Sequence, residues 1–290
     1  MTPRPERPRE RNGGPERPRE RDGGPERPPE RDGALAFTSA RVKRLRQLMD
    51  RSSMRDREQA FVVEGPTLVA EALDSSAELE CLFVGPGATA PVVARAIATG
   101  VPVFDLAPGV LERVAGTVTP QPVLAIARTL DVDLDELAGA SLVVVCVDVR
   151  DPGNLGTVLR SAEAAGVGGI ICCDGSVDVY NPKCVRASAG SLFHTRIVAR
   201  GEPVKVLGTL GEWGLRRLGT RADDGEPYHR VDLTAPTALV LGNEAHGLSA
   251  SVAGALDGWV SIPMEGRAES LNVGMAAAVL CFEAARQRAA

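Results

Sequence analysis

Residues 239–273 decide the fold, beginning LVLGNEAHGLS (239–249) and ending SIPMEGRAESLNV (261–273). In each part an apolar run breaks into a polar loop, the first after Leu241 and the second after Met264. Polar loops at the carboxyl ends of neighbouring strands line the ligand crevice of an open α/β sheet. We therefore expect this stretch to form part of a binding site at such a sheet edge.

A second strand-and-loop unit lies upstream, at residues 142–156, reading LVVVCVDVRDPGNLG. Its first half is typical of a buried parallel strand, and the helical 3.6-residue repeat then continues to Gly166. Asn154 stands at the start of this helix, and Arg160 lies off its apolar stripe. Taken alone, the unit is better explained by Asn154 as a helix cap and Arg160 as a solvated charge.

The chain before this unit alternates between short strand and helix patterns, which predicts a small α/β domain over residues 36–130. Residues 131–140 are expected to be a linker, and residues 141–290 a second domain. The expected strands are 61–64, 79–84, 101–104 and 123–127, and the expected helices are 41–50, 66–73, 91–98 and 108–114.

Residues 1–35 repeat a decad of the type RPRERNGGPE. The repeat is rich in Pro and Gly and has almost no apolar side chain that could join a core, so we expect a disordered tail. Its interleaved charges favour a solubilising extension over an RNA-contacting arm.

Composition restricts the class of protein. The net charge of −5 and the 3% of aromatic residues argue against general charge-driven or stacking-driven binding of nucleic acid. The six cysteines contain no C-x-x-C pair, which predicts buried free thiols, and the three histidines give no zinc-ligand spacing. Without an apolar run long enough to cross a bilayer or a signal-peptide core, we expect a cytoplasmic protein with no metal and no membrane partner.

One segment reverses the acidic balance: seven basic residues and three acids lie between Arg41 and Glu58. Neutralising phosphates is the main source of affinity for nucleic acids, so the segment predicts contact with RNA. A solvated helix face is the alternative. The residues expected to contact RNA are Arg41, Lys43, Arg44, Arg46, Arg55 and Arg57.

Three motifs occur in order: N-L-G-x-x-x-R from Asn154 to Arg160, G-N-E-x-x-G-L-S from Gly242, and I-P-M-x-G-x-x-x-S-L-N-V from Ile262. Together they resemble the SpoU, or TrmH-type, RNA ribose 2′-O-methyltransferases of the SPOUT superfamily. Residues 36–130 also resemble the L30e-like RNA substrate-binding domain that precedes the catalytic domain in many of these enzymes.

The resemblance implies an α/β fold with a mostly parallel sheet threaded into a trefoil knot, an exception to the usual unknotted topology. It also implies S-adenosyl-L-methionine as cofactor, structured RNA as substrate, and a homodimer that shares its active sites. A Rossmann methyltransferase is the competing fold, but the glycines at residues 166–169 do not open a helix and fail G-x-G-x-x-G.

The resemblance assigns roles to residues of all three motifs. The expected catalytic residues are Arg160, Asn154, Glu244, Ser270 and Asn272. The expected cofactor-binding residues are Gly242, Ile262, Leu271, Leu241, Asn243, Gly247 and Met264. Thr220 is also expected to bind the cofactor, because it ends the strand at residues 215–219, and an ordinary strand-end Thr is an equal alternative. The missing Cβ of Gly242 would let a ligand approach the main chain closely.

Arg160 is the residue to which the family assigns activation of the ribose hydroxyl. A guanidinium remains protonated, so binding phosphate and polarising the hydroxyl fits its chemistry better than abstracting a proton. Two positions depart from the family pattern, because Ala245 replaces a common Gly and Gly274 a common Ser. Both concern the shape of the pocket.

We expect ribosomal RNA, and 23S RNA in particular, to be the substrate, with transfer RNA as the alternative. A non-catalytic RNA-binding protein is a second hypothesis, but it predicts loss of Arg160, Asn154 or Glu244, and all three are present. A methyltransferase for small molecules or proteins is a third. The basic segment and the separate first domain argue against it.

Overall fold

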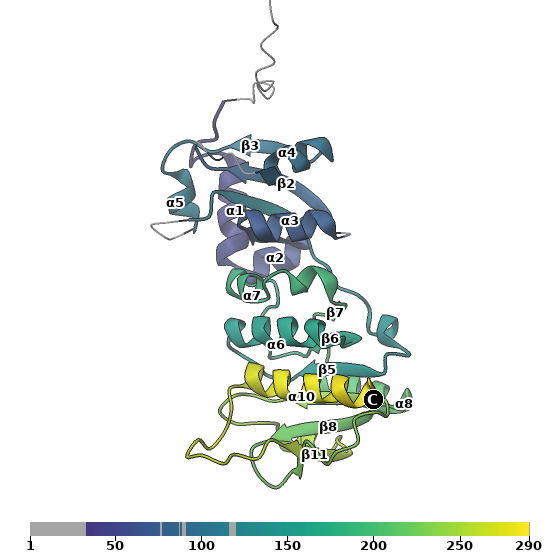
Figure 1. Cartoon of the computed structure of the whole chain (residues 1–290). Helices are drawn as coiled ribbons and strands as arrows, with labels where there is room; N and C mark the ends of the chain where they lie inside the picture. The colour runs from purple at the N-terminus through teal and green to yellow at the C-terminus, as the bar shows by residue number, and fades with distance from the viewer. Residues whose placement is uncertain (1–32, 76, 87, 89–90, 116–119, 290) are drawn as a thin grey trace, which may run out of the picture. The chain divides into compact units, whose positions relative to one another are not determined.

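A seven-stranded sheet organises the downstream half of the chain in the computed structural model, which describes residues 33–289 except 76, 87, 89–90 and 116–119. Its order is β7-β6-β5-β10-β8-β11-β9, and its pairings are parallel. The strands are β5 (Leu142–Cys146), β6 (Gly169–Cys172), β7 (Ile197–Val198), β8 (Arg216–Arg221), β9 (Glu226–Pro227), β10 (Thr237–Leu241) and β11 (Gly258–Ser261). The expected parallel α/β sheet is confirmed (Figure 1).

Helices join these strands, and α6 packs against both α7 and α10. The predicted apolar stripe of α6 is buried, and Arg160 is exposed as expected. Gly156 permits the close approach of α7, since a Cβ there would lie 2.7 Å from the carbonyl oxygen of Cys184. The helices of this half are α6 (Pro152–Ala164), α7 (Pro182–Ala187), η2 (Ser191–His194), α8 (Pro203–Glu212), α9 (Ala250–Ala253) and α10 (Val273–Arg288).

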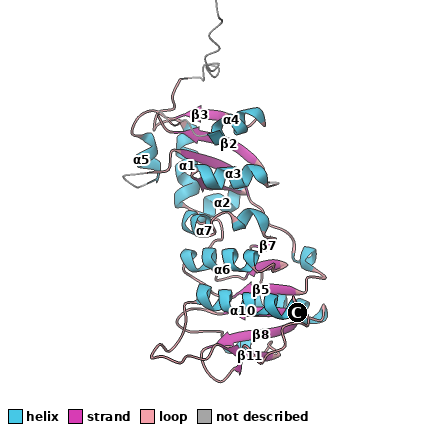
Figure 2. Cartoon of the chain, in the orientation of Figure 1, coloured by secondary structure: helices cyan, strands magenta, loops and turns pink. Residues whose placement is uncertain are grey.

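The upstream half has a four-stranded sheet in the order β1-β4-β2-β3, in which β4 is antiparallel to both neighbours. Strands and helices alternate as the sequence predicts (Figure 2). The strands are β1 (Ala60–Glu64), β2 (Leu79–Val84), β3 (Val103–Asp105) and β4 (Val123–Arg128). The helices are α1 (Ala40–Asp50), α2 (Ser52–Glu58), α3 (Pro66–Asp74), α4 (Pro91–Ala98) and α5 (Val110–Ala115).

Helix α2 was not among the predicted elements. Its sequence SSMRDRE has no apolar stripe, and it buries Met54 together with the side chain of Arg55. A helix held through a buried guanidinium gives no hydrophobic period, so the pattern of apolar residues does not reveal it.

The segment expected to be a linker is folded. It contains η1 (Leu134–Leu137), whose Leu137 is fully buried, and Asp131 forms a bridge with Ile197. The two halves share one hydrophobic core, in which the rings of Phe61 and Tyr180 lie 4.6 Å apart. The described residues accordingly belong to one compact unit.

At the N-terminal side, Leu35 already bridges Leu106, so the structure of the upstream half includes a residue just before the predicted start of this domain at residue 36. The predicted disorder concerns residues 1–35, of which 1–32 lie outside the described residues. All six cysteines are free and buried, as predicted. Within the described part of the chain, no helix is long and apolar enough to cross a membrane.

Candidate active site

A pocket of about 290 Å³ opens at the carboxyl edge of the large sheet. It lies at the ends of the neighbouring strands β10, β8 and β11, and the carboxyl ends of strands are where open α/β sheets bind ligands. Its wall combines strand-end loops with one face of α10. The lining residues are Thr220, Arg221, Ala222, Gly242, Asn243, Glu244, Ala245, Gly247, Val260, Ile262, Met264, Ser270, Leu271, Val273, Ala276 and Leu280.

The loop after β10 is held in shape by Asn243. Its backbone exchanges hydrogen bonds with Gly247 at 3.1 and 2.9 Å, and its side-chain oxygen accepts from the N–H groups of Ala245 and His246. Its side-chain amide donates to the carbonyl of Asp148, at 2.9 Å, and so ties this loop to the one after β5. Asn243 therefore shapes the pocket by organising the loop.

Two glycines are required by this loop geometry. Gly247 has a φ of +66°, in the left-handed region that favours glycine. A Cβ on Gly242 would lie 2.7 Å from the carbonyl carbon of Gly247. The expected reason for Gly242 was close approach by a ligand, but in the structure the loop itself fills that space.

A chain of side-chain amides connects α10 to Glu244 at the pocket. Asn272 caps α10 through its Oδ1, and its amide donates to Asn154 Oδ1 at 2.7 Å. The Asn154 amide then donates to Glu244 Oε1 at 2.8 Å. A carboxylate only accepts hydrogen bonds, so Glu244 fixes the orientation of Asn154. We call Asn272, Asn154 and Glu244 the amide relay.

The relay keeps Glu244 ionised. Burial by itself raises the pKa of this carboxyl, but the hydrogen bond from Asn154 and those from nearby backbone N–H groups outweigh it. The pKa of Glu244 therefore lies below its ordinary value. An ionised, oriented acceptor at the pocket can hold a hydroxyl-bearing ligand in a fixed position.

Asn154 is not the N-terminal cap of α6, which was one interpretation of its position in the sequence. The cap of α6 is Asp151, whose side chain accepts from the backbone N–H of Asn154 at 2.9 Å. Asp151 also pairs with Lys183, at 2.8 Å. The side chain of Asn154 is consequently not needed as a cap, and it is available to the relay.

The structure brings most of the expected cofactor-binding residues together. Leu241 is the exception, because it is buried in β10 with 1% exposure and does not line the pocket. Several lining residues were not predicted. The signals for them were weak: Arg221 directly follows Thr220 at the end of β8, and Val273, Ala276 and Leu280 follow a helical spacing along α10.

Among the expected catalytic residues, Ser270 and Glu244 line the pocket, and Asn154 and Asn272 belong to the relay. Arg160 is exposed on α6 and does not line the pocket. Its position six residues after Asn154 corresponds to roughly 9 Å along the helix axis and to a side-chain direction about 120° away. Within one chain, Arg160 is therefore separate from the relay.

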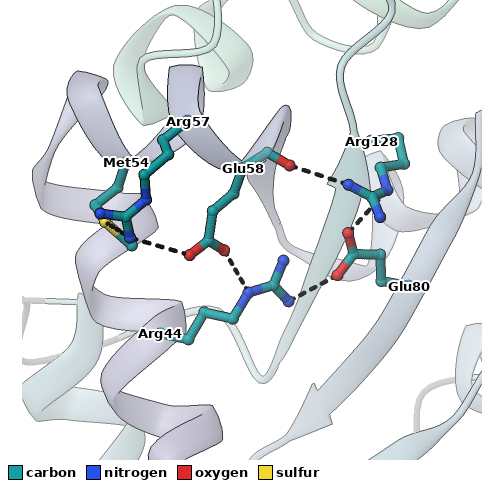
Figure 3. Close-up of polar contacts among 6 residues, drawn as sticks. All are labelled: Arg44, Met54, Arg57, Glu58, Glu80 and Arg128. Atoms are coloured by element: carbon teal, nitrogen blue, oxygen red, sulfur yellow. Dashed lines mark hydrogen bonds and ion pairs between the residues drawn. The ribbon is translucent and has the colours of Figure 1, made fainter.

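Some basic residues of α1 and α2 form ion pairs within the fold. Arg44 bridges Glu58 and Glu80 at 2.6 and 2.7 Å, and Figure 3 shows Arg57 and Arg128 joining the same network. The pKa of Arg44 is raised: burial alone would lower it, but its two carboxylate partners together outweigh burial.

The expectation that Arg55 contacts RNA is wrong for this structure. Arg55 is buried, with 3% exposure, and pairs with Asp178 at 2.6 Å across the junction of the two halves. Arg41, Lys43, Arg46 and Arg57 remain exposed. Within the described residues no group of three or more His, Cys, Asp or Glu side chains could hold a metal ion.

Comparison with protein families gives two matches. Residues 141–282 match the SpoU rRNA Methylase family, and residues 39–125 match the MRM3-like substrate binding domain. The first match contains the whole pocket and the relay, and the second covers most of the upstream half.

Individual relatives agree with these matches. The chain is 35% identical over 228 residues to the 23S rRNA (guanosine(2553)-2'-O)-methyltransferase RlmP of Bacillus subtilis, covering 79% of this chain and 89% of that protein. An rRNA methyltransferase from Sinorhizobium meliloti has a similar structure, with a TM-score of 0.79 and 30% identity over 88% of this chain and 97% of that one. The SpoU methyltransferase AviRb from Streptomyces viridochromogenes, solved with AdoMet, gives a TM-score of 0.78 and 31% identity over 87% of this chain and 99% of that one.

Proposed function

We propose, since this chain belongs to the SpoU rRNA methylase family, that it methylates the 2′-oxygen of a ribose in ribosomal RNA, with 23S RNA as the favoured target. The observation that carries the proposal is the amide relay at the edge of the pocket, which supplies an oriented carboxylate beside a hollow fit for a nucleoside. The 23S RNA assignment is supported by the similarity to the Bacillus subtilis 23S rRNA 2'-O-methyltransferase.

The pocket suits S-adenosylmethionine. Val260, Ile262 and Leu280 give it an apolar wall that matches the face of an adenine ring, and backbone groups at the strand ends can meet the polar edge of the ring. When bound, this cofactor supplies a methyl group on a positively charged sulfur. As the ribose oxygen forms its bond to that carbon, the carbon–sulfur bond breaks and the hydroxyl proton is released to water.

The contribution of the protein is chiefly positioning. An in-line transfer requires the ribose oxygen to be held in line with the methyl group, and correct placement can supply much of the rate enhancement. Glu244, fixed by Asn154, can accept a hydrogen bond from a ribose hydroxyl, and Ser270 lies on the same wall. A guanidinium is a hydrogen-bond donor and not an acceptor, so the role of Arg160 is to bind phosphate and polarise the reacting hydroxyl.

We also infer a homodimer, because Arg160 does not reach the pocket of its own chain. Met275 and Phe282 are seven residues apart on α10 and are 56% and 52% exposed. They form an exposed apolar face on the same helix that lines the pocket. A second copy covering this face would bury both side chains and could bring its own Arg160 to the relay. The proposal includes the family's trefoil knot and a cytoplasmic location, where ribosomal RNA is found.

Transfer of a labelled methyl group tests the function. The protein is incubated with methyl-labelled S-adenosylmethionine and, separately, 23S, 16S and transfer RNA, and the labelled nucleotide is then mapped. Label in 23S RNA supports the proposal, while label in transfer RNA would redirect the substrate assignment. An intact protein that binds the cofactor but labels no RNA would show that it is not an RNA methyltransferase.

Mixing two inactive variants tests the shared site. If the arginine comes from the partner subunit, a mixed dimer of Arg160→Ala and Asn154→Ala carries both defects in one pocket and leaves the other pocket intact. Co-expression should then restore part of the activity that each variant lacks alone. Absence of any recovery, with mixed dimers demonstrated by affinity tags, would assign Arg160 to its own chain.

A further inference from the structure

A second hollow, of about 300 Å³, lies outside the pocket and is lined by basic side chains from three helices. Arg46 comes from α1, Arg113 from α5, and Lys183 and Arg186 from α7. Among the described residues that line it, Asp50 is the acidic one. We call this hollow the basic groove.

The basic groove combines four cations with one carboxylate in a chain whose net charge is −5. Some of this charge is neutralised locally: Lys183 pairs with Asp151, and Arg186 pairs with Glu64 at 2.6 Å. Each pair uses part of the donors that an ammonium or guanidinium carries. The side chains of Lys183 and Arg186 are 57% and 49% exposed, so their remaining donors face solvent.

Phe37 positions the other two cations without using their donors. The guanidinium of Arg46 lies 5.4 Å from the centre of this ring, and that of Arg113 lies 5.5 Å from it. A cation over an aromatic face is attracted by the ring and keeps its N–H groups free. Arg46 also faces Asp50, at the long distance of 3.9 Å. Both guanidinium groups are thus held against one ring with hydrogen-bond donors to spare.

One short chain of contacts leads from the basic groove to the relay. Lys183 contacts Asp151 through one carboxylate oxygen, and the other oxygen of Asp151 accepts from the backbone N–H of Asn154. Asn154 then donates to Glu244. The basic groove is therefore linked to the relay through Asp151.

We propose that the basic groove binds the sugar–phosphate backbone of the RNA substrate next to the methylated nucleotide and sets its register against the relay. The proposal rests on the proposed RNA methyltransferase activity. Phosphate contacts fix the position of a nucleic acid without reading its sequence, which suits a groove lined by guanidinium and ammonium groups. The proposal adds Arg113, Lys183 and Arg186 to the residues expected to contact RNA, and all three lie outside the basic segment of α1 and α2.

The test compares Arg46→Ala/Arg113→Ala with native protein. The RNA is a 23S fragment carrying the mapped nucleotide, and the dissociation constant is measured over a range of salt concentrations alongside KM and kcat. Loss of two phosphate contacts should weaken binding by about 15- to 30-fold near 0.15 M salt and lower the salt slope by about 1.4 to 1.8. KM for RNA should rise similarly, while kcat at saturating RNA and the affinity for S-adenosylmethionine should stay near native values.

Arg95→Ala is the matched control, because Arg95 is exposed and paired with Asp74 on the surface of the same half. It lies on α4, on the other side of this half from α5 (Figure 1). If the double variant behaves like Arg95→Ala in KM and salt slope while native protein methylates the RNA, the groove proposal is overturned and the methyltransferase activity stands. If native protein methylates no RNA, both proposals fall.

Discussion

Replacing Asn154 with alanine removes the middle of the amide relay. The change should lower the rate of methyl transfer far more than it lowers the stability of the fold. The change deletes the donor to Glu244, at 2.8 Å, and the acceptor from Asn272, at 2.7 Å. Both bonds lie at a partly exposed site, so together they should contribute only about 1–2 kcal/mol to the free energy of unfolding. For a chain of this size that corresponds to a loss of roughly 2–6 °C in Tm.

The effect on turnover should be much larger. Removing one preorganised polar group from an active site typically lowers kcat about 100- to 1000-fold, or about 2.7–4 kcal/mol. Without the Asn154 hydrogen bond, the pKa of Glu244 should also rise, because that bond helps to lower it. Since activity is assigned to the ionised carboxylate, the acid limb of the pH–kcat profile should move to higher pH in Asn154→Ala.

Methyl-transfer kinetics from pH 4 to pH 9, together with thermal unfolding, measure these effects, and a double-mutant cycle with Glu244→Gln provides the control. If Asn154 acts through Glu244, the double variant should be little slower than either single one. The reasoning is refuted if the two losses multiply, if the acid limb stays in place, or if the loss of Tm alone accounts for the lost activity.

The remaining predictions concern packing and pH. Gly156→Ala puts a Cβ 2.5 Å from that of Ala187 and should lower stability by about 1–3 kcal/mol, whereas Gly208→Ala, with open space, should not destabilise; thermal unfolding compares them. Burial raises the pKa of Asp131 despite the hydrogen bond from Tyr180, so its ionisation opposes folding once the pH exceeds its ordinary pKa. Asp131→Asn should therefore raise Tm at pH 7 relative to native protein, and the difference should shrink as the pH falls through the raised pKa toward the ordinary value of 3.8; a constant or growing difference would contradict this.

Much of the pocket could be predicted from short motifs because its loops follow their strands directly. Gly247 is required by a local left-handed turn, and Ile262 and Leu271 lie beside elements whose apolar pattern is clear. The pattern gave no comparable signal for Ala276 and Leu280, since small and apolar residues on a helix usually pack in the core. Only the placement of α10 beside the strand ends brings them to the pocket.

The basic segment shows the opposite case, in which local composition misled. Arg55 and Arg57 are two residues apart in the same short helix, yet Arg55 is buried against Asp178 and the side chain of Arg57 is 68% exposed. The difference depends on a carboxylate 123 residues away. The sequence correctly shows an excess of positive charge in this segment. It does not show which of these side chains form ion pairs within the fold and which remain exposed.

The sequence by itself determined the alternation of strands and helices, apart from α2 and η1, and the identity of the polar groups that meet at the sheet edge, because period, glycine placement and motif order are properties of neighbouring residues. The tertiary structure decided what those groups do. Asn154 is part of a relay and not a cap, because Glu244 and Asn272 approach it from 90 and 118 residues along the chain. Arg160 lies outside its own pocket because α6 turns it to solvent. Contacts of this range depend on how the whole sheet is threaded, which no local pattern contains.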